Sequence, residues 1–130
     1  MRKSKSSVVS VVAMTGVVSA LLATSSSSWA AGDVAVGLQV FTRCAVCHSN
    51  VPGENKIGPS LAGVFGRKAG SEPGYSYSSA LKSTNITWDE HTLNQFLTNP
   101  GADVHGTKMF LSVPNMADRE NLIAYLQTLK

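Results

Sequence analysis

The sequence of 130 residues is poor in cysteine and in charge, and it contains no run that reads as a β-strand. Its only two cysteines are three positions apart, so disulfide bonds cannot join distant segments, and a disulfide-stapled scaffold is excluded. Charged residues make up 15% of the chain. The length fits one small domain, and the lack of strand patterns and internal repeats favours an all-α class.

The first thirty residues differ in composition from the rest. A basic start, an apolar run and small residues follow one another: Arg2, Lys3 and Lys5, then Val8–Ala23, then Ser28-Trp29-Ala30. This order is typical of a secretory signal peptide. We therefore expect residues 1–30 to be a cleaved signal peptide and residues 31–130 to be the functional domain. The alternative is an uncleaved membrane anchor, although the apolar run is shorter than the ~20 residues of a spanning helix.

The net charge of +3 comes entirely from the first five residues. Residues 31–130 hold eight basic and eight acidic side chains. This balance gives no support for nucleic acid or an anionic membrane surface as a partner. A domain of 100 residues has a modest hydrophobic core, and a large bound cofactor would complete it.

Helical spacing of apolar residues appears in three places. We expect helices over 34–44, with Asp33 as its cap, over 87–98, with a capping box formed by Thr87 and Glu90, and over 115–129. Gly37 inside the first of them indicates a close helix crossing, because glycine in a helix is otherwise costly. Residues 49–83 are rich in glycine and proline and read as a long loop, which favours wrapping around a ligand.

The chemically informative motif is Cys44-Ala45-Val46-Cys47-His48, which has the C-x-x-C-H spacing of c-type haem attachment. On a helical turn, residues three and four apart share a face. The thiols of Cys44 and Cys47 can then add to the two vinyl groups of one haem c, while His48 ligates its iron. A redox dithiol or half of a zinc site would fit a bare C-x-x-C. The adjacent histidine, the absence of further cysteines and the export signal favour haem.

The second axial ligand decides what the iron can do, since an open position would bind or activate small molecules. Residues 31–130 offer Met109 and Met116. Met109 lies in a loop that is long enough to cross the opposite face of the haem, whereas a methionine at the start of the last helix is more often core filling. The pattern therefore favours Met109 over Met116.

The domain resembles the class I c-type cytochromes of the mitochondrial and photosynthetic-bacterial type over nearly its whole length. The resemblance rests on motifs in the family's order: Gly32-Asp33-Val34, Cys44–His48, Ile57–Leu61, Gly63–Gly70, Gly74–Tyr77, Ile86–Trp88, Asn99-Pro100, Gly106–Met109 and Leu122–Leu126. It implies the class I cytochrome c fold, in which helices and long loops surround one covalently bound haem.

The resemblance also implies roles for individual residues. Met109 matches the second axial ligand, and Pro59 matches the residue whose carbonyl accepts a hydrogen bond from the axial histidine. Arg67, Tyr77 and Trp88 match the groups that hold a buried haem propionate. The chain departs from the family at Phe96, where a tyrosine usually donates to the methionine sulfur, and the ring of lysines around the haem edge is largely missing.

These expectations describe a soluble, monomeric periplasmic electron shuttle of a bacterial respiratory chain, with His48 and Met109 as iron ligands and no catalytic residues. Its partners would be redox proteins: a donor complex or dehydrogenase, and a terminal oxidase or reductase. Two alternatives stay open at this point. One is a peroxidase-like or gas-binding cytochrome with an open sixth position, and the other is a membrane-anchored subunit of a respiratory complex.

Overall fold

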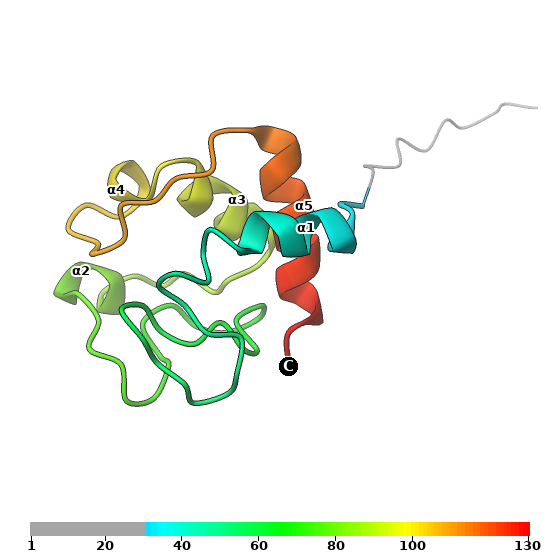
Figure 1. Ribbon diagram of the computed structural model, residues 1–130. Helices are drawn as coiled ribbons and strands as arrows, with labels where there is room; N and C mark the ends of the chain where they lie inside the picture. Colours follow the sequence, from blue (N-terminus) through cyan, green and yellow to red (C-terminus); the bar gives the residue numbers. More distant parts are fainter. Residues whose placement is uncertain (1–30) are drawn as a thin grey trace, which may run out of the picture.

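The structure, a computed structural model, describes residues 31–130, so the predicted signal peptide at 1–30 lies outside the described residues. Within residues 31–130 the chain forms five helices, which Figure 1 labels: α1 (Val34–Phe41), α2 (Ser79–Lys82), α3 (Glu90–Thr98), α4 (Pro100–Asp103) and α5 (Met116–Thr128). Within this part of the chain the only β pairing is an isolated bridge between Lys68 and Thr87. None of the described helices combines the length and the apolar character that crossing a membrane requires.

Two helix ends differ from the predicted ones, because local turns and capping hydrogen bonds set them. α1 ends at Phe41 rather than at residue 44, because the following residues form turns. α3 begins at Glu90, since the capping box is made by Asp89 and Thr92: the Thr92 amide donates to Asp89 Oδ1 at 2.8 Å, and the Asp89 amide donates to Thr92 Oγ1 at 2.9 Å. The predicted box of Thr87 and Glu90 is therefore wrong.

Two short helices were not predicted. α2 lies inside the segment that reads as a loop, and α4 starts at Pro100, where the sequence predicts a helix end followed by a loop. A proline at the first helical position is favourable because its missing N–H has no partner there. Pro100 therefore ends α3 and begins α4.

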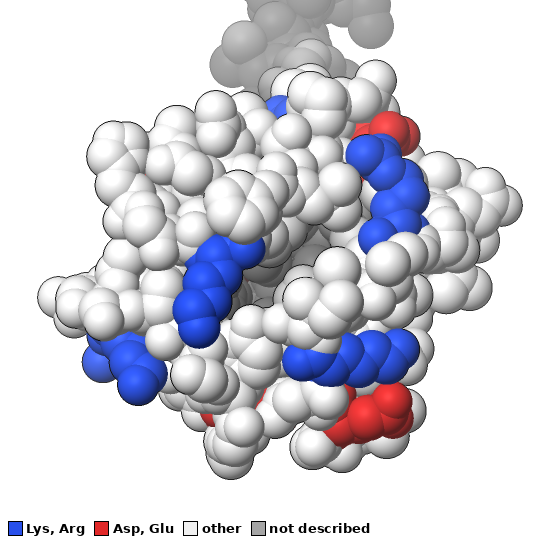
Figure 2. Space-filling view, turned by 60° about the vertical axis from the view of Figure 1, so that its left-hand side comes forward, with Lys and Arg blue, Asp and Glu red and all other residues white. Residues whose placement is uncertain are grey.

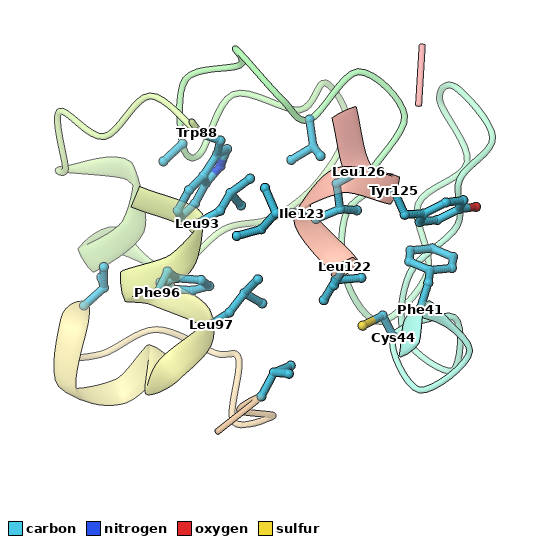
Figure 3. Packing of buried hydrophobic residues seen from close by; sticks show 14 residues of the cluster. Phe41, Cys44, Trp88, Leu93, Phe96, Leu97, Leu122, Ile123, Tyr125 and Leu126 are labelled. Atoms are coloured by element: carbon cyan, nitrogen blue, oxygen red, sulfur yellow. The ribbon is translucent and has the colours of Figure 1, made fainter. Parts of the chain in front are cut away.

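α1 and α5 cross at close range (Figure 1). The crossing depends on Gly37, because a Cβ at this position would overlap the Asn121 carbonyl and stand 2.8 Å from Tyr125 Cβ. Next to it, the rings of Phe41 and Tyr125 lie beside each other (Figure 3), with their centroids 5.0 Å apart. The close helix crossing predicted from Gly37 is thus confirmed.

The remaining core joins α3 to α5. Figure 3 shows Trp88, Leu93, Phe96 and Leu97 facing Leu122, Ile123 and Leu126 of α5. The long loop of residues 49–78 and the loop of residues 104–115 cover the side of the molecule away from the α1–α5 crossing (Figure 1). These two loops, together with α3 and α5, enclose the site described next.

Candidate cofactor site

A cavity of about 500 Å³ opens between the two long loops and the helices. Apolar side chains form most of its wall, and none of the described residues that line it is acidic. All eight residues singled out from the sequence line it: Cys44, Cys47, His48, Pro59, Arg67, Tyr77, Trp88 and Met109. Figure 2 shows a hollow on this face, edged by Lys and Arg side chains. The fold therefore gathers the predicted residues from six separate segments around one space.

The two cysteines reach the cavity from a tight turn that follows α1. The amides of Cys47 and His48 both donate to the Cys44 carbonyl, at 3.0 and 2.9 Å. These bonds have the spacing of a helical turn, which puts residues three and four apart on one side. Both thiols are free, and burial raises the pKa of the Cys44 thiol. The sulfurs of both cysteines thus border the cavity next to the histidine.

The His48 imidazole is held by the loop on its other side. His48 Nδ1 lies 2.7 Å from the Pro59 carbonyl oxygen. Because a carbonyl only accepts, Nδ1 carries the proton, and Nε2 keeps a lone pair for a ligand or metal. Burial lowers the pKa of His48, which favours the neutral imidazole that a metal needs.

Gly58 was not predicted as a site residue. A Cβ at residue 58 would overlap the His48 ring, so the loop can approach the imidazole only with glycine there. The Gly58 amide also donates to the Cys47 carbonyl at 2.8 Å. The sequence signal that could have identified Gly58 is its position directly before Pro59, which was predicted as a site residue.

The two methionines are placed very differently. Met109 is partly buried, packs against the core and lines the cavity. Its amide donates to Thr107 Oγ1 at 3.3 Å, and Nζ of the neighbouring Lys108 donates to the Ser76 carbonyl at 2.8 Å. Met116 is 61% exposed and does not line the cavity, so its interpretation as core filling is wrong.

Arg67 anchors the polar end of the cavity. Its Nη1 donates to the Ala62 carbonyl at 3.0 Å and to Glu72 Oε2 at 2.6 Å, and its Nη2 donates to the Ser60 carbonyl at 2.8 Å. Nε is the one buried side-chain nitrogen or oxygen in residues 31–130 that has no hydrogen-bond partner. A cavity-lining cation with an unused donor suits an anionic ligand group.

Tyr77 and Trp88 stand near this arginine. The Tyr77 hydroxyl accepts a hydrogen bond from the Glu72 amide at 3.2 Å, and burial raises the pKa of Tyr77. Trp88 is buried, its amide donates to the Arg67 carbonyl at 2.9 Å, and its ring packs 5.0 Å from Phe96. Glu72 is a further member of this cluster that the sequence did not reveal, because it lies in a loop with no periodic pattern.

The residues present fit a covalently bound haem. Two free thiols, an imidazole with a free Nε2 and a methionine border one largely apolar space. The unpartnered Nε of Arg67 suits a haem carboxylate, which is costly to bury without a partner. A structural zinc site needs four Cys or His ligands, which these residues do not supply. Within residues 31–130, no three or more His, Cys, Asp or Glu side chains are grouped so that they could hold a metal ion.

Comparison with known proteins identifies relatives along the whole domain. The family model for cytochrome c matches residues 34–130. Cytochrome c2 of Rhodomicrobium vannielii is 47% identical over 119 residues, which is 90% of this chain and 93% of the relative. Cytochrome c2 of Rhodoblastus acidophilus is 50% identical over 102 residues, with coverages of 77% and 95%. The solved structure of cytochrome cH from Methylobacterium extorquens has 42% identity and a TM-score of 0.70, with 75% of this chain and 99% of that chain covered.

The similarity extends from sequence to architecture. The predicted class I cytochrome c fold is confirmed, because the described residues form helices without a sheet and match a solved cytochrome structure. The family match and the spacing of Cys44, Cys47 and His48 agree with the cavity that these residues border. The chain belongs to the cytochrome c family, and its cofactor is one haem c bound covalently through Cys44 and Cys47.

Proposed function

We propose that this chain is a soluble periplasmic electron carrier with His48 and Met109 as the two iron ligands. The observation that carries the proposal is that both residues, which lie sixty-one positions apart, line one apolar cavity next to the two thiols. A haem bound in this way supplies reversible one-electron redox chemistry. The chain itself binds, orients and shields the cofactor and is not an enzyme.

Each cavity residue has a defined task in this proposal. Cys44 and Cys47 hold the cofactor, and Pro59 fixes the His48 tautomer so that Nε2 is the ligand atom. Arg67, Tyr77 and Trp88 hold the buried carboxylate of the cofactor. Apolar residues fill the rest of the wall and exclude water. Less solvent then has to reorient when the cofactor gains or loses an electron.

The position of Met109 favours an electron carrier over a peroxidase-like or gas-binding protein. A thioether at the sixth position closes the iron to exogenous molecules. Met116 is exposed and lies outside the cavity wall in the described structure, which supports Met109 rather than Met116 as the ligand.

Exposed residues at the cavity entrance offer a place for redox partners. Five of the lining residues are solvent-exposed: Arg43, Ile57, Lys108, Phe110 and Leu111. We call these five residues the mouth. Phe110 is 90% and Ile57 76% exposed, and such an apolar patch suits the small contacts of transient redox complexes. The partners are a donor complex or dehydrogenase and a terminal oxidase or reductase, and the carrier is a monomer.

Export is part of the same proposal. The relatives from Rhodomicrobium vannielii and Rhodoblastus acidophilus are both named cytochrome c2, and residues 1–30 have the composition of a signal peptide, whose removal leaves 31–130 as the cytochrome domain. Cell fractionation followed by N-terminal sequencing tests this. Mature protein that starts at Ala31 in the periplasm supports it, whereas membrane-bound protein that retains residues 1–30 supports an anchored subunit.

The ligands are tested by expression together with haem-attachment machinery and by absorption spectra of both redox states. The Cys44→Ser, Cys47→Ser double variant should release its haem to acid acetone, because both thioether links are lost. Met109→Ala should keep covalent haem, lose the red charge-transfer band of methionine-ligated ferric haem and bind cyanide faster. Met116→Ala is the matched control and should behave as wild type. The reverse result for the two methionines would assign the ligand to Met116.

A further inference from the structure

Glu72 forms the only salt bridge within residues 31–130. Its Oε2 lies 2.6 Å from Arg67 Nη1, and the side chains of Arg67 and Glu72 are 15% and 10% exposed. Glu72 does not itself line the cavity, whereas Arg67 does. The carboxylate therefore contacts the cavity arginine from outside the cofactor space.

Glu72 also contacts the second polar group of the cavity. Its backbone amide donates to the Tyr77 hydroxyl oxygen at 3.2 Å. Because this bond uses a lone pair of the hydroxyl, the O–H of Tyr77 stays free to donate to another acceptor. One residue thus holds both Arg67 and Tyr77, through its side chain and its backbone.

The charge of Glu72 matters because Arg67 has no other anionic partner among the described residues. The remaining acceptors of the guanidinium are the neutral carbonyls of Ser60 and Ala62. A largely buried cation with only carbonyl partners would act with its full positive charge on the cavity. The carboxylate of Glu72 neutralises it, so that Arg67 offers its unpartnered Nε–H to the cofactor as part of a neutral pair.

We propose that Glu72 is a positioning residue that directs Arg67 and Tyr77 at the carboxylate of the cofactor, and that its negative charge lowers the reduction potential. The oxidised state carries one positive charge more than the reduced state, so a nearby carboxylate in a poorly solvated place favours oxidation. The proposal rests on the electron-carrier function and on the carboxylate-binding role of Arg67 and Tyr77.

The test is a potentiometric titration of the Glu72→Gln holoprotein, since glutamine keeps an acceptor for Arg67 and removes the charge. We expect the equilibrium to shift towards the reduced state by about twofold or more, which for one electron is ~18 mV. Glu54→Gln is the control, because Glu54 is exposed, makes no salt bridge within residues 31–130 and does not line the cavity. Its shift should be much smaller, since water and salt screen an exposed charge.

A double-variant cycle shows whether Glu72 acts through the arginine. In an Arg67→Met background, Glu72→Gln should shift the potential by less than half as much. Without the guanidinium, the carboxylate is free to turn to solvent. Equal shifts in both backgrounds would overturn a role that acts through Arg67.

The outcomes separate this inference from the proposed function. A wild-type protein without a reversible one-electron step would refute the proposed function itself. A normal wild type in which Glu72→Gln and Glu54→Gln give the same shift would overturn the role of Glu72. If Glu72→Gln does not accumulate, Glu72→Ala is titrated instead, with the same expected direction. In that variant, the Arg67 Nε–H should exchange with solvent faster in NMR spectra, and an unchanged exchange rate would contradict positioning.

Discussion

The imidazole of His48 lies against the backbone of Gly58, at which an added Cβ would stand 2.7 Å from Nδ1. The same nitrogen is 2.7 Å from the carbonyl oxygen of Pro59. Residues 58 and 59 thus define the position of the ring in two ways: Gly58 leaves room for it, and the Pro59 carbonyl accepts a hydrogen bond from its Nδ1–H.

We therefore predict that Gly58→Ala displaces the imidazole and destabilises the holoprotein by ~1–3 kcal/mol, the usual range for overpacking. Denaturant unfolding of the holoprotein measures the loss, and the yield of covalent haem reports on the placement of the ring. Gly101→Ala is the control, because its Cβ would meet nothing closer than 3.9 Å. Equal stability of the two variants would show that the close approach at Gly58 is not required.

The sequence predicted those parts of the site that depend on local spacing. The turn that places Cys44 and Cys47 follows from residues three apart, and the close crossing at Gly37 follows from the cost of glycine in a helix. The roles of Arg67 and Tyr77 came only from the family resemblance, because a lone arginine or tyrosine has no pattern of its own. The cavity now shows that these residues lie together.

What the sequence could not predict depends on long-range geometry. Glu72 and Gly58 lie in a loop without periodicity, and their importance appears only when the chain brings them against Arg67 and His48. The cap of α3 was misplaced for a related reason. Both Thr87 and Asp89 suit an N-cap by type, and only the backbone path decides that Asp89 takes the position.

Asp89 should make the stability of the domain depend on pH in the acidic range. Hydrogen bonds from the backbone and side chain of Thr92 lower the pKa of Asp89. A lowered pKa means that the stabilising contribution is complete above the unfolded value of ~3.9 and is lost as the pH falls through the folded value. Asp89→Ala should therefore be less stable than wild type at neutral pH, and the difference should shrink below about pH 4.

Urea unfolding at several pH values measures this difference. Asp89→Asn is the matched control, because asparagine also caps helices but has no titrating group. Its stability relative to Asp89→Ala should stay nearly constant with pH. A gap between wild type and Asp89→Ala that does not change on acidification would show that the cap is not charge-assisted.

Phe96→Tyr should raise the reduction potential. Phe96 and Met109 both line the cavity, and we expect a hydroxyl at residue 96 to donate a hydrogen bond to the sulfur of Met109. With Met109 as the proposed iron ligand, a hydrogen bond to its sulfur withdraws electron density and favours the ferrous state. Phe41→Tyr is the control: Phe41 is buried to a similar degree but packs on Tyr125 outside the cavity wall. Potentiometry in which both variants match wild type would contradict the prediction.

The last prediction concerns the electrostatic field at the mouth. Residues 31–130 are neutral overall, yet the lining of the cavity includes Arg43 and Lys108 at its entrance and no acidic side chain among the described residues. Figure 2 shows basic side chains around the hollow. A local positive potential steers anions even when the net charge is zero. Oxidation by ferricyanide should therefore slow as the Debye length falls from ~30 Å to ~8 Å, and oxidation by a cationic cobalt complex should speed up.

Stopped-flow rates with the two reagents, measured across this range of ionic strength, test the sign of the field directly. Arg43→Gln and Lys108→Gln should each reduce the salt dependence with ferricyanide, because each removes one charge from the mouth. Lys130→Gln should leave it unchanged, since Lys130 does not line the cavity. Equal salt dependence for all three variants would show that the field comes from the whole domain rather than from the mouth. A rate with ferricyanide that rises with salt would show that the potential at the mouth is negative and would contradict the prediction.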